Sequence, residues 1–219
     1  MTSLETLISL LPTLMKGLVV TLEVFLLGSV VAAVLAFIAG LMRLSKFRIV
    51  RFLAAFYVEF FRGTSLLIQL FWIFYVLPFF GLDLSALTAG VLALGLNYGA
   101  YGSEVVRSAI LSVPRGQTEA AIALNMSPVL RFRRIILPQA WPLMIPPFGN
   151  LFIELLKGTS LVSLITLSDL TFQAMSLRTT VSKLEIPIFA LLLIIYFVIA
   201  YAVTLVMRAL EKKATVGRA

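Results

Sequence analysis

The sequence predicts an all-α membrane protein that forms one bundle of five membrane-spanning helices, and its composition is the first reason. Of its 219 residues, 61% are hydrophobic and only 13% are charged, and the mean hydropathy is +1.06. Soluble domains have about 45–50% apolar and about 25% charged residues, so this composition is typical of a protein in a bilayer. The second reason is length, because the chain accommodates about five spans of ~20–25 residues with their loops.

The spans are predicted from long apolar segments at residues 17–42, 52–80, 86–111, 141–166 and 186–207. Residues 1–15 carry leucine and isoleucine at near-helical spacing, which predicts a separate short helix on the membrane surface. The longest polar stretch, residues 112–140, is expected to form a structured cytoplasmic loop, and a mixed segment at 167–185 precedes the last span.

Basic residues decide the predicted orientation. The formal net charge is +8, from 18 basic and 10 acidic residues. Residues 43–51, 112–140 and 208–219 each contain four basic residues, so twelve of the eighteen lie on one side of the predicted membrane. Cytoplasmic loops are enriched in lysine and arginine, so we expect the N-terminus outside and the C-terminus in the cytoplasm. This topology accounts for the positive charge, and no nucleic-acid partner is expected.

Several function classes are disfavoured by residues that the sequence lacks. It has no cysteine and no histidine, so we expect no disulfide scaffold, no metal site and no Cys–His or Ser–His catalysis. A membrane-embedded enzyme would depend on the carboxylates of Glu59, Glu104 and Glu154 alone. The pattern Gly-x-x-x-x-Gly-Lys-[Ser/Thr] is also missing, so ATP and Mg²⁺ would be bound by another chain. We expect a non-catalytic protein with no cofactor of its own.

An eight-residue pattern occurs twice, 95 residues apart. Residues 59–66 read Glu-Phe-Phe-Arg-Gly-Thr-Ser-Leu, and residues 154–161 read Glu-Leu-Leu-Lys-Gly-Thr-Ser-Leu. Each copy lies early in a span that is predicted to run from the cytoplasm outward. The two copies therefore share one direction across the membrane, as in a parallel repeat, although chance also explains so short a match.

Charged residues in or near the spans form three predicted ion pairs, which are Glu59 with Arg62, Glu104 with Arg107, and Glu154 with Lys157. A spacing of three puts both partners on one helix face. A charge in hydrocarbon costs at least ~2.5–3.5 kcal/mol, so these groups are expected to face the bundle interior or an aqueous cavity. Two interpretations stay open: the pairs line a path for a polar substrate, or they are structural pairs near the cytoplasmic membrane boundary.

Uncharged polar residues add to this possible substrate path. Glycine weakens a helix, and the hydroxyls of the Gly-Thr-Ser triplets can then bind a zwitterion. The alternative interpretation is that these small residues permit close helix packing. Gln69 and Asn97 lie well inside spans and carry the same two interpretations. The candidate path residues are Thr64, Ser65, Gln69, Asn97, Glu154, Gly158, Thr159 and Ser160.

The segment 112–140 predicts a short, stiff helix between two spans. Thr118 is a suitable N-cap, and Asn125 tolerates the left-handed conformation that ends a helix. Ser127 followed by proline then predicts the start of the next helix. Small side chains at Ala120 and Ala121 suit docking into a groove of another protein. An ordinary amphipathic loop on lipid head groups is the alternative.

At this point the residues resemble a known family. Arg-Gly-Gln-Thr-Glu-Ala-Ala at 115–121, with Asn125 six positions after the glutamate and Ile-Leu-Pro at 136–138, resembles the EAA loop of ABC importer permeases. Phe-Arg-Gly-Thr-Ser-Leu-Leu-Ile-Gln at 61–69 and Leu-Pro-Gln-Ala at 137–140 are similar to the polar amino acid subfamily, the histidine, glutamine, arginine and opine type. The resemblance covers nearly the whole chain.

The resemblance implies a type I transmembrane subunit in the bacterial cytoplasmic membrane, paired with a second identical or similar permease. Two ATPase subunits would dock on it, and an extracytoplasmic binding protein would deliver a small zwitterionic substrate for uptake by alternating access. By position, the ATPase-docking residues would be Arg115, Gly116, Glu119, Ala120, Ala121 and Asn125.

Two positions depart from the family pattern. Asn125 stands where the family usually has glycine, and Gly158 stands where many relatives have aspartate or another polar residue. The missing side chain at Gly158 leaves open whether this chain or a partner contacts the substrate. The alternatives to a polar amino acid are an ectoine-like compatible solute and an opine. An ion-coupled carrier without an ATPase would give the docking loop no role, and a purely structural subunit is less economical because it leaves the paired polar motifs unexplained.

Overall fold

The computed structural model describes residues 3–180 and 184–215, which are helical throughout apart from short turns and linkers. The α-helices in chain order are α1 (Ser3–Arg43), α2 (Arg48–Gly63), α3 (Leu66–Phe71), α4 (Ala86–Leu111), α5 (Arg115–Ala123), α6 (Pro128–Arg131), α7 (Leu137–Gly158), α8 (Leu170–Thr180) and α9 (Glu185–Thr215). Short segments of π-helix or 3₁₀-helix extend α3 to Phe80, join α6 to α7, and extend α7 to Ile165.

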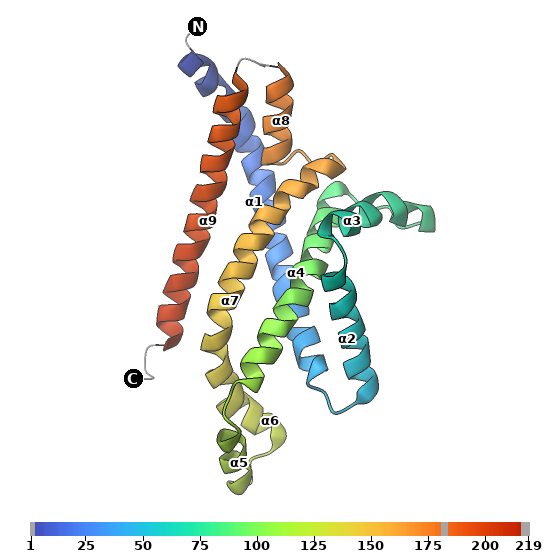
Figure 1. The fold of residues 1–219 in the computed structure, drawn as a ribbon, viewed down its shortest axis with the longest axis vertical. Coiled ribbons are helices and arrows are strands. Elements are labelled where there is room, and N and C mark those ends of the chain that lie inside the picture. The colour runs from blue at the N-terminus through green and yellow to red at the C-terminus, as the bar shows by residue number, and fades with distance from the viewer. Residues whose placement is uncertain (1–2, 181–183, 216–219) are drawn as a thin grey trace.

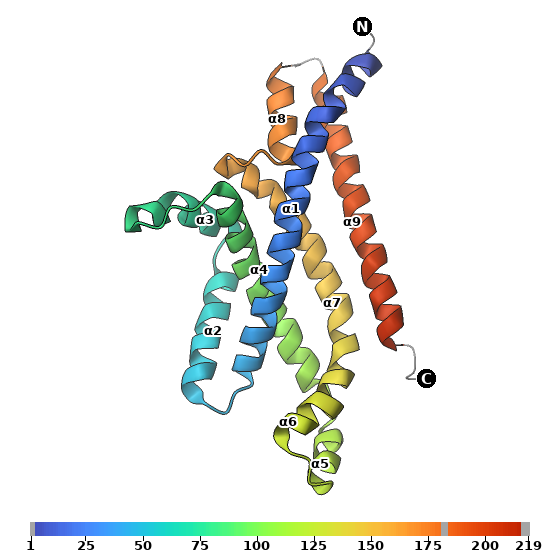
Figure 2. The same ribbon diagram turned by 180° about the vertical axis from the view of Figure 1, so that it is seen from behind.

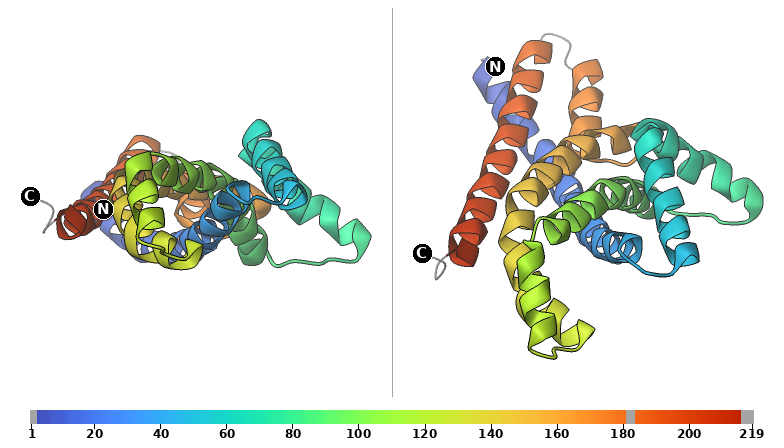
Figure 3. Two further views of the ribbon diagram at one scale, coloured as in Figure 1. Left: turned by 90° about the horizontal axis from the view of Figure 1, so that it is seen from below. Right: turned by 60° about the horizontal axis from the view of Figure 1, so that its bottom comes forward.

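The helices form an elongated bundle with two functional ends. The hairpin of α5 and α6 lies at one end of the long axis, and the N-terminus and α8 lie at the other (Figures 1 and 2). Helices α2 and α3 stand on one side of the bundle, and α9 stands on the opposite side (Figures 1 and 3). The chain therefore presents different helices to its surroundings on the two sides.

Helix α4 lies at the centre of the bundle against α1 because its packing face is made of glycine and alanine. A Cβ on Gly99 would lie 2.8 Å from Cβ of Leu35, and a Cβ on Gly102 would lie 2.7 Å from Cβ of Ala36. Both distances are shorter than real carbon contacts, so the two backbones approach only because these side chains are absent. Gly95, four residues before Gly99, makes the same close contact against Val31 of α1.

Three described segments have the length and hydropathy of a membrane span: Leu10–Arg43, Pro128–Ile165 and Glu185–Ala214. The bent pair Arg48–Gly63 and Leu66–Phe80 makes a fourth if it is one span. Helix α4 has 26 residues and the same bounds as the predicted third span. Its glycines, serines, tyrosines and Asn97 lower its hydropathy, which a central helix tolerates because other helices cover it.

One sequence expectation about helix continuity is wrong, and the segment predicted as the second span is bent. The separate surface helix at residues 1–15 does not exist in the described chain, since α1 is continuous from Ser3 to Arg43. Gly17 stays helical at the expected junction, and its missing side chain lets α1 lie against the linker before α8. A Cβ there would lie 2.7 Å from the carbonyl oxygen of Asp169. The predicted second span is also not straight, because it bends by 105° after Gly63.

The start of α8 is fixed to the bundle by buried polar groups. Asp169 is fully buried, and its two carboxylate oxygens accept hydrogen bonds from the main-chain N–H groups of Thr171 (3.2 Å) and Phe172 (2.9 Å). The main-chain N–H of Leu170 donates to the hydroxyl of Thr21 on α1 (3.0 Å). Burial removes water from the Asp169 carboxyl and raises its pKa to about 6. The hydrogen bonds from Phe172 and Thr171 lower the pKa, but they only partly offset the effect of burial.

Candidate functional site

Polar side chains from α2, α4 and α7 meet on one exposed surface of the bundle. The hydroxyl of Tyr98 donates to the main-chain oxygen of Glu154 on α7 (2.9 Å). The hydroxyl of Tyr101 donates to the main-chain oxygen of Arg62 on α2 (3.5 Å). Tyr98 and Tyr101 share one face of α4, so they join the other two helices into a continuous surface. We call this surface the polar face, and it comprises Arg62, Thr64, Ser65, Tyr98, Tyr101, Glu154 and Lys157.

The polar face continues into a cleft toward the α5–α6 end. A cavity of about 370 Å³ between α4 and α7 is lined by Glu104, Ser108 and Ser112, with Leu143 and Pro147 across from them. On α4, Ser108 and Ser112 lie on the same helix face as Tyr101, at spacings of seven and four residues. On α7, Leu143 and Pro147 lie on the same face as Glu154, at spacings of four and seven residues. The polar face and the cleft therefore form one track along the groove between the two helices.

Two charged residues of the polar face have no ionic partner in the described part of the chain. Glu154 and Lys157 are both exposed on α7. The predicted ion pair between them is not formed, since no described acid or base lies within 4.0 Å of either group. An exposed, unpaired charge on a membrane helix needs water, a ligand or another protein beside it. The polar face is therefore suited to an aqueous path or a subunit interface.

The bend after α2 is held by Gln69 and Asn97. The side-chain amide of Gln69 donates to the main-chain oxygens of Phe61 (2.9 Å) and Thr64 (3.2 Å), and Asn97 donates to the same Phe61 oxygen (3.0 Å). These carbonyls lose their helical partners where the helix breaks. Both amide side chains are buried, and Asn97 also donates to the Gln69 oxygen (3.0 Å). The structure thus places these two predicted path residues inside the bend, not on the exposed surface.

The two copies of the repeated pattern adopt different structures. Both lie at the end of a helix and not early in a span as expected. After Gly63 the chain is extended at Thr64 and Ser65, which leaves both side chains exposed. After Gly158 the chain stays helical and tightens to a 3₁₀-helix from Thr159 to Ile165. The two hydroxyls there donate to main-chain oxygens three residues earlier, from Thr159 to Leu156 (2.6 Å) and from Ser160 to Lys157 (2.8 Å).

A side chain at Gly158 would be crowded, because its neighbours would have to move by a few tenths of an ångström to admit it. A Cβ at this position would lie 3.0 Å from the Tyr98 hydroxyl, 3.1 Å from Cδ2 of Leu94 and 3.3 Å from Cδ2 of Leu66. Tyr98 therefore occupies the space beside Gly158 and presents its hydroxyl near this part of the polar face. Tyr98 and Tyr101 are not among the path residues predicted from the sequence, although their i, i+3 spacing in a glycine-rich helix puts both on one face.

The remaining charges form one network around Glu104 at the junction of α1, α2 and α4. Glu104 contacts Arg43 on α1, Arg62 on α2 (3.5 Å) and Arg107 on its own helix (3.0 Å). The predicted pair of Glu104 with Arg107 is present. The predicted pair of Glu59 with Arg62 is not, because Arg62 turns to Glu104 and Glu59 lies 3.9 Å from Arg43. Sequence reasoning missed Arg43, whose pairing depends on which helices are neighbours.

The α5–α6 end contains the predicted docking helix. Helix α5 begins at Arg115, directly after Pro114, so the expected N-cap at Thr118 is wrong by one turn. Arg115, Gly116, Glu119 and Ala120 are exposed, and Ala121 is buried on the inner side of the helix. Asn125 has a φ of 53°, the left-handed conformation expected for the helix end. The Ser127 hydroxyl accepts from the N–H of Leu130 (3.4 Å), as expected for an N-cap.

The fold and the track define a membrane-embedded transport subunit with an exposed helical hairpin at one end. Among the described residues, no group of three or more acidic side chains is placed to hold a metal ion. Residues 32–216 match the sequence profile of the binding-protein-dependent transport system inner membrane component family. The chain belongs to this family.

Similar proteins share nearly the whole chain. The probable amino-acid ABC transporter permease protein y4tF of Sinorhizobium fredii is 47% identical over 91% of this chain and 86% of its own length. The L-cystine transport system permease protein TcyB of Bacillus subtilis is 39% identical over 92% of this chain and 86% of its own length. A chain in the crystal structure of an amino acid ABC transporter with histidines is 33% identical, with a TM-score of 0.88 over 97% of this chain and 99% of that chain.

Proposed function

We propose that this chain is the membrane subunit of an ATP-driven importer for polar amino acids or closely related small zwitterions. The observation that carries the proposal is the track that joins the exposed charges of Glu154 and Lys157 to the cleft at Glu104. The similar proteins from Sinorhizobium fredii and Bacillus subtilis, named for amino-acid and L-cystine transport, support the substrate class.

In this proposal the chain crosses a bacterial cytoplasmic membrane five times. The spans are α1, the bent unit of α2 and α3, α4, α7 with its 3₁₀ extension, and α9. Five crossings put the N-terminus outside and the C-terminus inside, in agreement with the basic residues near the end of α1, in α5–α6 and at the end of α9. Helix α8 then lies on the outer side, where a substrate-binding protein would dock.

The partners follow from the exposed hairpin. Two ATPase subunits bind ATP and Mg²⁺ and dock on α5 of this chain and of a second, identical or similar permease. The exposed residues Arg115, Gly116, Glu119 and Ala120 contact the ATPase, and Asn125 sets the direction of the chain that returns to α7. Closure of the ATPases on ATP draws the two α5 helices together and opens the path outward, and hydrolysis reverses the motion.

The polar face binds the substrate in this mechanism. Glu154 offers a carboxylate to an ammonium group and Lys157 offers an ammonium to a carboxylate, one helical turn apart. Thr64 and Ser65 are extended and exposed at the break, where Ser65 offers its hydroxyl to the substrate. The Thr64 hydroxyl lies on the same surface but already donates to the Phe60 main-chain oxygen (2.8 Å) and accepts from Gln69 (2.7 Å). Ser160 is half-buried one turn after Lys157, while Gln69, Asn97, Gly158 and Thr159 are buried and support the path from behind.

The test compares Glu154→Gln with Glu23→Gln in the complete transporter reconstituted in vesicles. Glu23 is also an exposed acid on a membrane helix, but it lies on α1 and outside the polar face. The proposal predicts that Glu154→Gln lowers ATP-driven amino-acid uptake by about tenfold or more, since one charge-assisted hydrogen bond to the substrate is lost. Glu23→Gln is expected to transport normally. Equal uptake by both variants would contradict the assignment of the path.

A further inference from the structure

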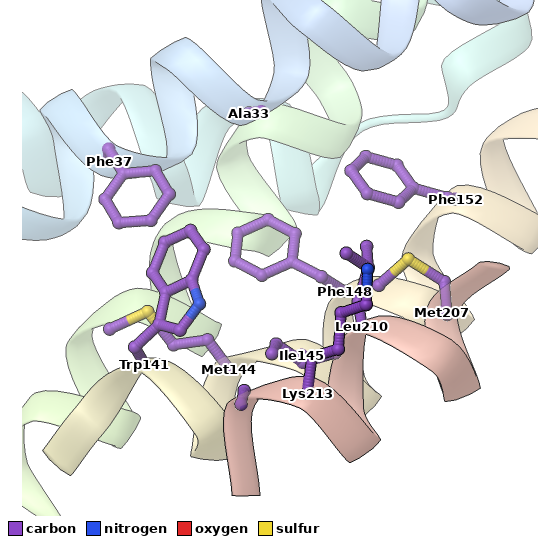
Figure 4. A pocket seen from close by; sticks show the side chains of 11 residues that line it. Ala33, Phe37, Trp141, Met144, Ile145, Phe148, Phe152, Met207, Leu210 and Lys213 are labelled. Carbon is purple, nitrogen blue, oxygen red and sulfur yellow. The ribbon is translucent and has the colours of Figure 1, made fainter. Parts of the chain in front are cut away.

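An apolar groove of about 430 Å³ lies between α1, α7 and α9, away from the polar face (Figure 4). One wall is aromatic, with the rings of Trp141 and Phe37 6.0 Å apart, Phe37 and Phe148 6.1 Å apart, and Phe148 and Phe152 5.9 Å apart. The opposite wall comes from the last turns of α9, which contribute Met207, Leu210 and Lys213. The function proposed above makes no use of this groove.

The groove faces lipid because α7 has two different sides. Trp141, Ile145, Phe148 and Phe152 recur at helical spacing on the groove side. Glu154 and Lys157, with Leu143 and Pro147 of the cleft, fall on the opposite side by the same spacing. Helix α9, which closes the groove, is only 6% buried in its most apolar 18-residue window. A helix so apolar and so exposed is a lipid-facing helix.

Two hydrogen-bond donors line this otherwise apolar groove. The Lys213 side chain lines the groove from α9, and Trp141 lines it from the first turns of α7 (Figure 4). No described carboxylate lies within 4.0 Å of the Lys213 ammonium, and no described residue accepts a hydrogen bond from the Trp141 indole N–H. Tryptophan and lysine near the end of a membrane helix are typical of the head-group region.

The length of the groove matches one leaflet of a bilayer. From Trp141 to Phe152 the α-helix rises eleven residues, or about 16 Å. Half of a hydrocarbon core of about 30 Å is about 15 Å. An acyl chain that begins beside Trp141 therefore ends near Phe152 and passes the Lys213 side chain on the way.

We propose that this groove binds an anionic phospholipid, with one acyl chain along the aromatic wall and the phosphate beside Lys213 and the Trp141 indole N–H. The lipid belongs to the leaflet at the α5–α6 end, which is the cytoplasmic leaflet in the orientation proposed above. Basic pockets between membrane helices on that side suit anionic head groups. A bound lipid would also fill the gap between α7 and α9 near the docking hairpin.

The test uses tryptophan fluorescence, since the chain has only two tryptophans. Trp72→Phe leaves Trp141 as the only tryptophan in the full-length chain. This variant is reconstituted in phosphatidylcholine vesicles that contain increasing amounts of lipid brominated on the acyl chains, which quenches tryptophan fluorescence on contact. Brominated phosphatidylglycerol should half-quench Trp141 at about a fivefold lower mole fraction than brominated phosphatidylcholine, as expected for one basic residue. Lys213→Gln should remove this difference, because it keeps the groove and removes the charge.

Two controls make the result specific to the groove. Lys46→Gln removes an exposed lysine from the loop before α2, and it should leave the preference for phosphatidylglycerol unchanged. Trp141→Phe leaves Trp72 on the arm after α3, and this reporter should be quenched equally by both lipids.

Equal quenching of Trp141 by the two lipids, or the same preference after Lys213→Gln, would overturn the proposal. Quenching by neither lipid would mean that a second permease covers the groove, which would overturn it as well. None of these outcomes depends on substrate or ATP.

Discussion

Asn97 on α4 donates a hydrogen bond of 3.0 Å to the side-chain oxygen of Gln69, and together they satisfy the main-chain oxygens that the break after α2 leaves free. A membrane helix can break only where such groups find partners, because lipid offers none. The buried amide pair therefore determines the shape of the α2–α3 unit, and through it the exposure of Thr64 and Ser65 on the polar face.

The first prediction removes one member of this pair. Asn97→Leu leaves the Phe61 oxygen with fewer donors and the Gln69 oxygen without one, so we expect a loss of about 1–3 kcal/mol in the free energy of unfolding. Asn150→Leu is the matched control, because Asn150 is exposed on α7. Thermal unfolding of both variants in detergent measures the difference. A similar small effect for both would show that the amide pair does not hold the bend.

The second prediction concerns the network around Glu104. Glu104 is 24% exposed and contacts three arginines, whereas Glu59 is 69% exposed and has one contact at 3.9 Å. Glu104→Gln leaves Arg43, Arg62 and Arg107 close together with only the exposed Glu59, 3.9 Å from Arg43, as a counter-charge, and we expect it to cost about 1–3 kcal/mol. Glu59→Gln is expected to cost less than about 1 kcal/mol. Chemical denaturation in detergent distinguishes the two, and equal costs would contradict a network centred on Glu104.

The third prediction is a pH dependence from Asp169. Burial raises its pKa from 3.8 to about 6, so the folded chain holds a proton that the unfolded chain has released between these values. The free energy of unfolding therefore falls as pH rises from about 4 to about 6. Asp169→Asn keeps an oxygen to cap α8 and removes the titration, so the stability of the wild type relative to this variant should fall by on the order of 1–3 kcal/mol over that range. Unfolding temperatures measured at pH 4, 5, 6 and 7 test this, and parallel pH profiles would contradict it.

The fourth prediction tests the docking helix. Glu119→Lys reverses an exposed charge on α5, so ATPase binding or coupling should be lost while membrane insertion is kept. Asp83→Lys makes the same change at an exposed position in the turn before α4, away from α5, and should leave uptake unchanged. ATP-driven uptake and the amount of bound ATPase are measured for both. Normal uptake by Glu119→Lys would contradict the assignment of α5 as the helix that contacts the ATPase.

Local sequence signals predicted most of the helices but not how the polar groups are shared between them. The bounds of α4 and the left-handed Asn125 follow from residues that are close in the chain. The bend after Gly63 does not, because the same Gly-Thr-Ser triplet stays helical after Gly158. The difference lies in distant partners such as Asn97, which stabilise a break in one copy only.

The candidate site shows the same limit. Periodicity put Glu154 and Lys157 on one helix face, and the structure shows that face exposed. The ion pairs expected within each helix were only partly right, because Arg62 and Glu59 each find a partner on another helix. Spacing along one helix cannot show that α1 brings Arg43 to α4, since this depends on the glycine packing between them.

The most direct test of the central claim is to purify the chain gently from its native membrane and identify the proteins that accompany it. The account predicts a P-loop ATPase in stoichiometric amount, together with a second copy of the chain or a similar permease. Vesicles that contain this complex should take up amino acids only when ATP is supplied. A chain that purifies without any ATPase, and that transports equally well without ATP, would contradict the account.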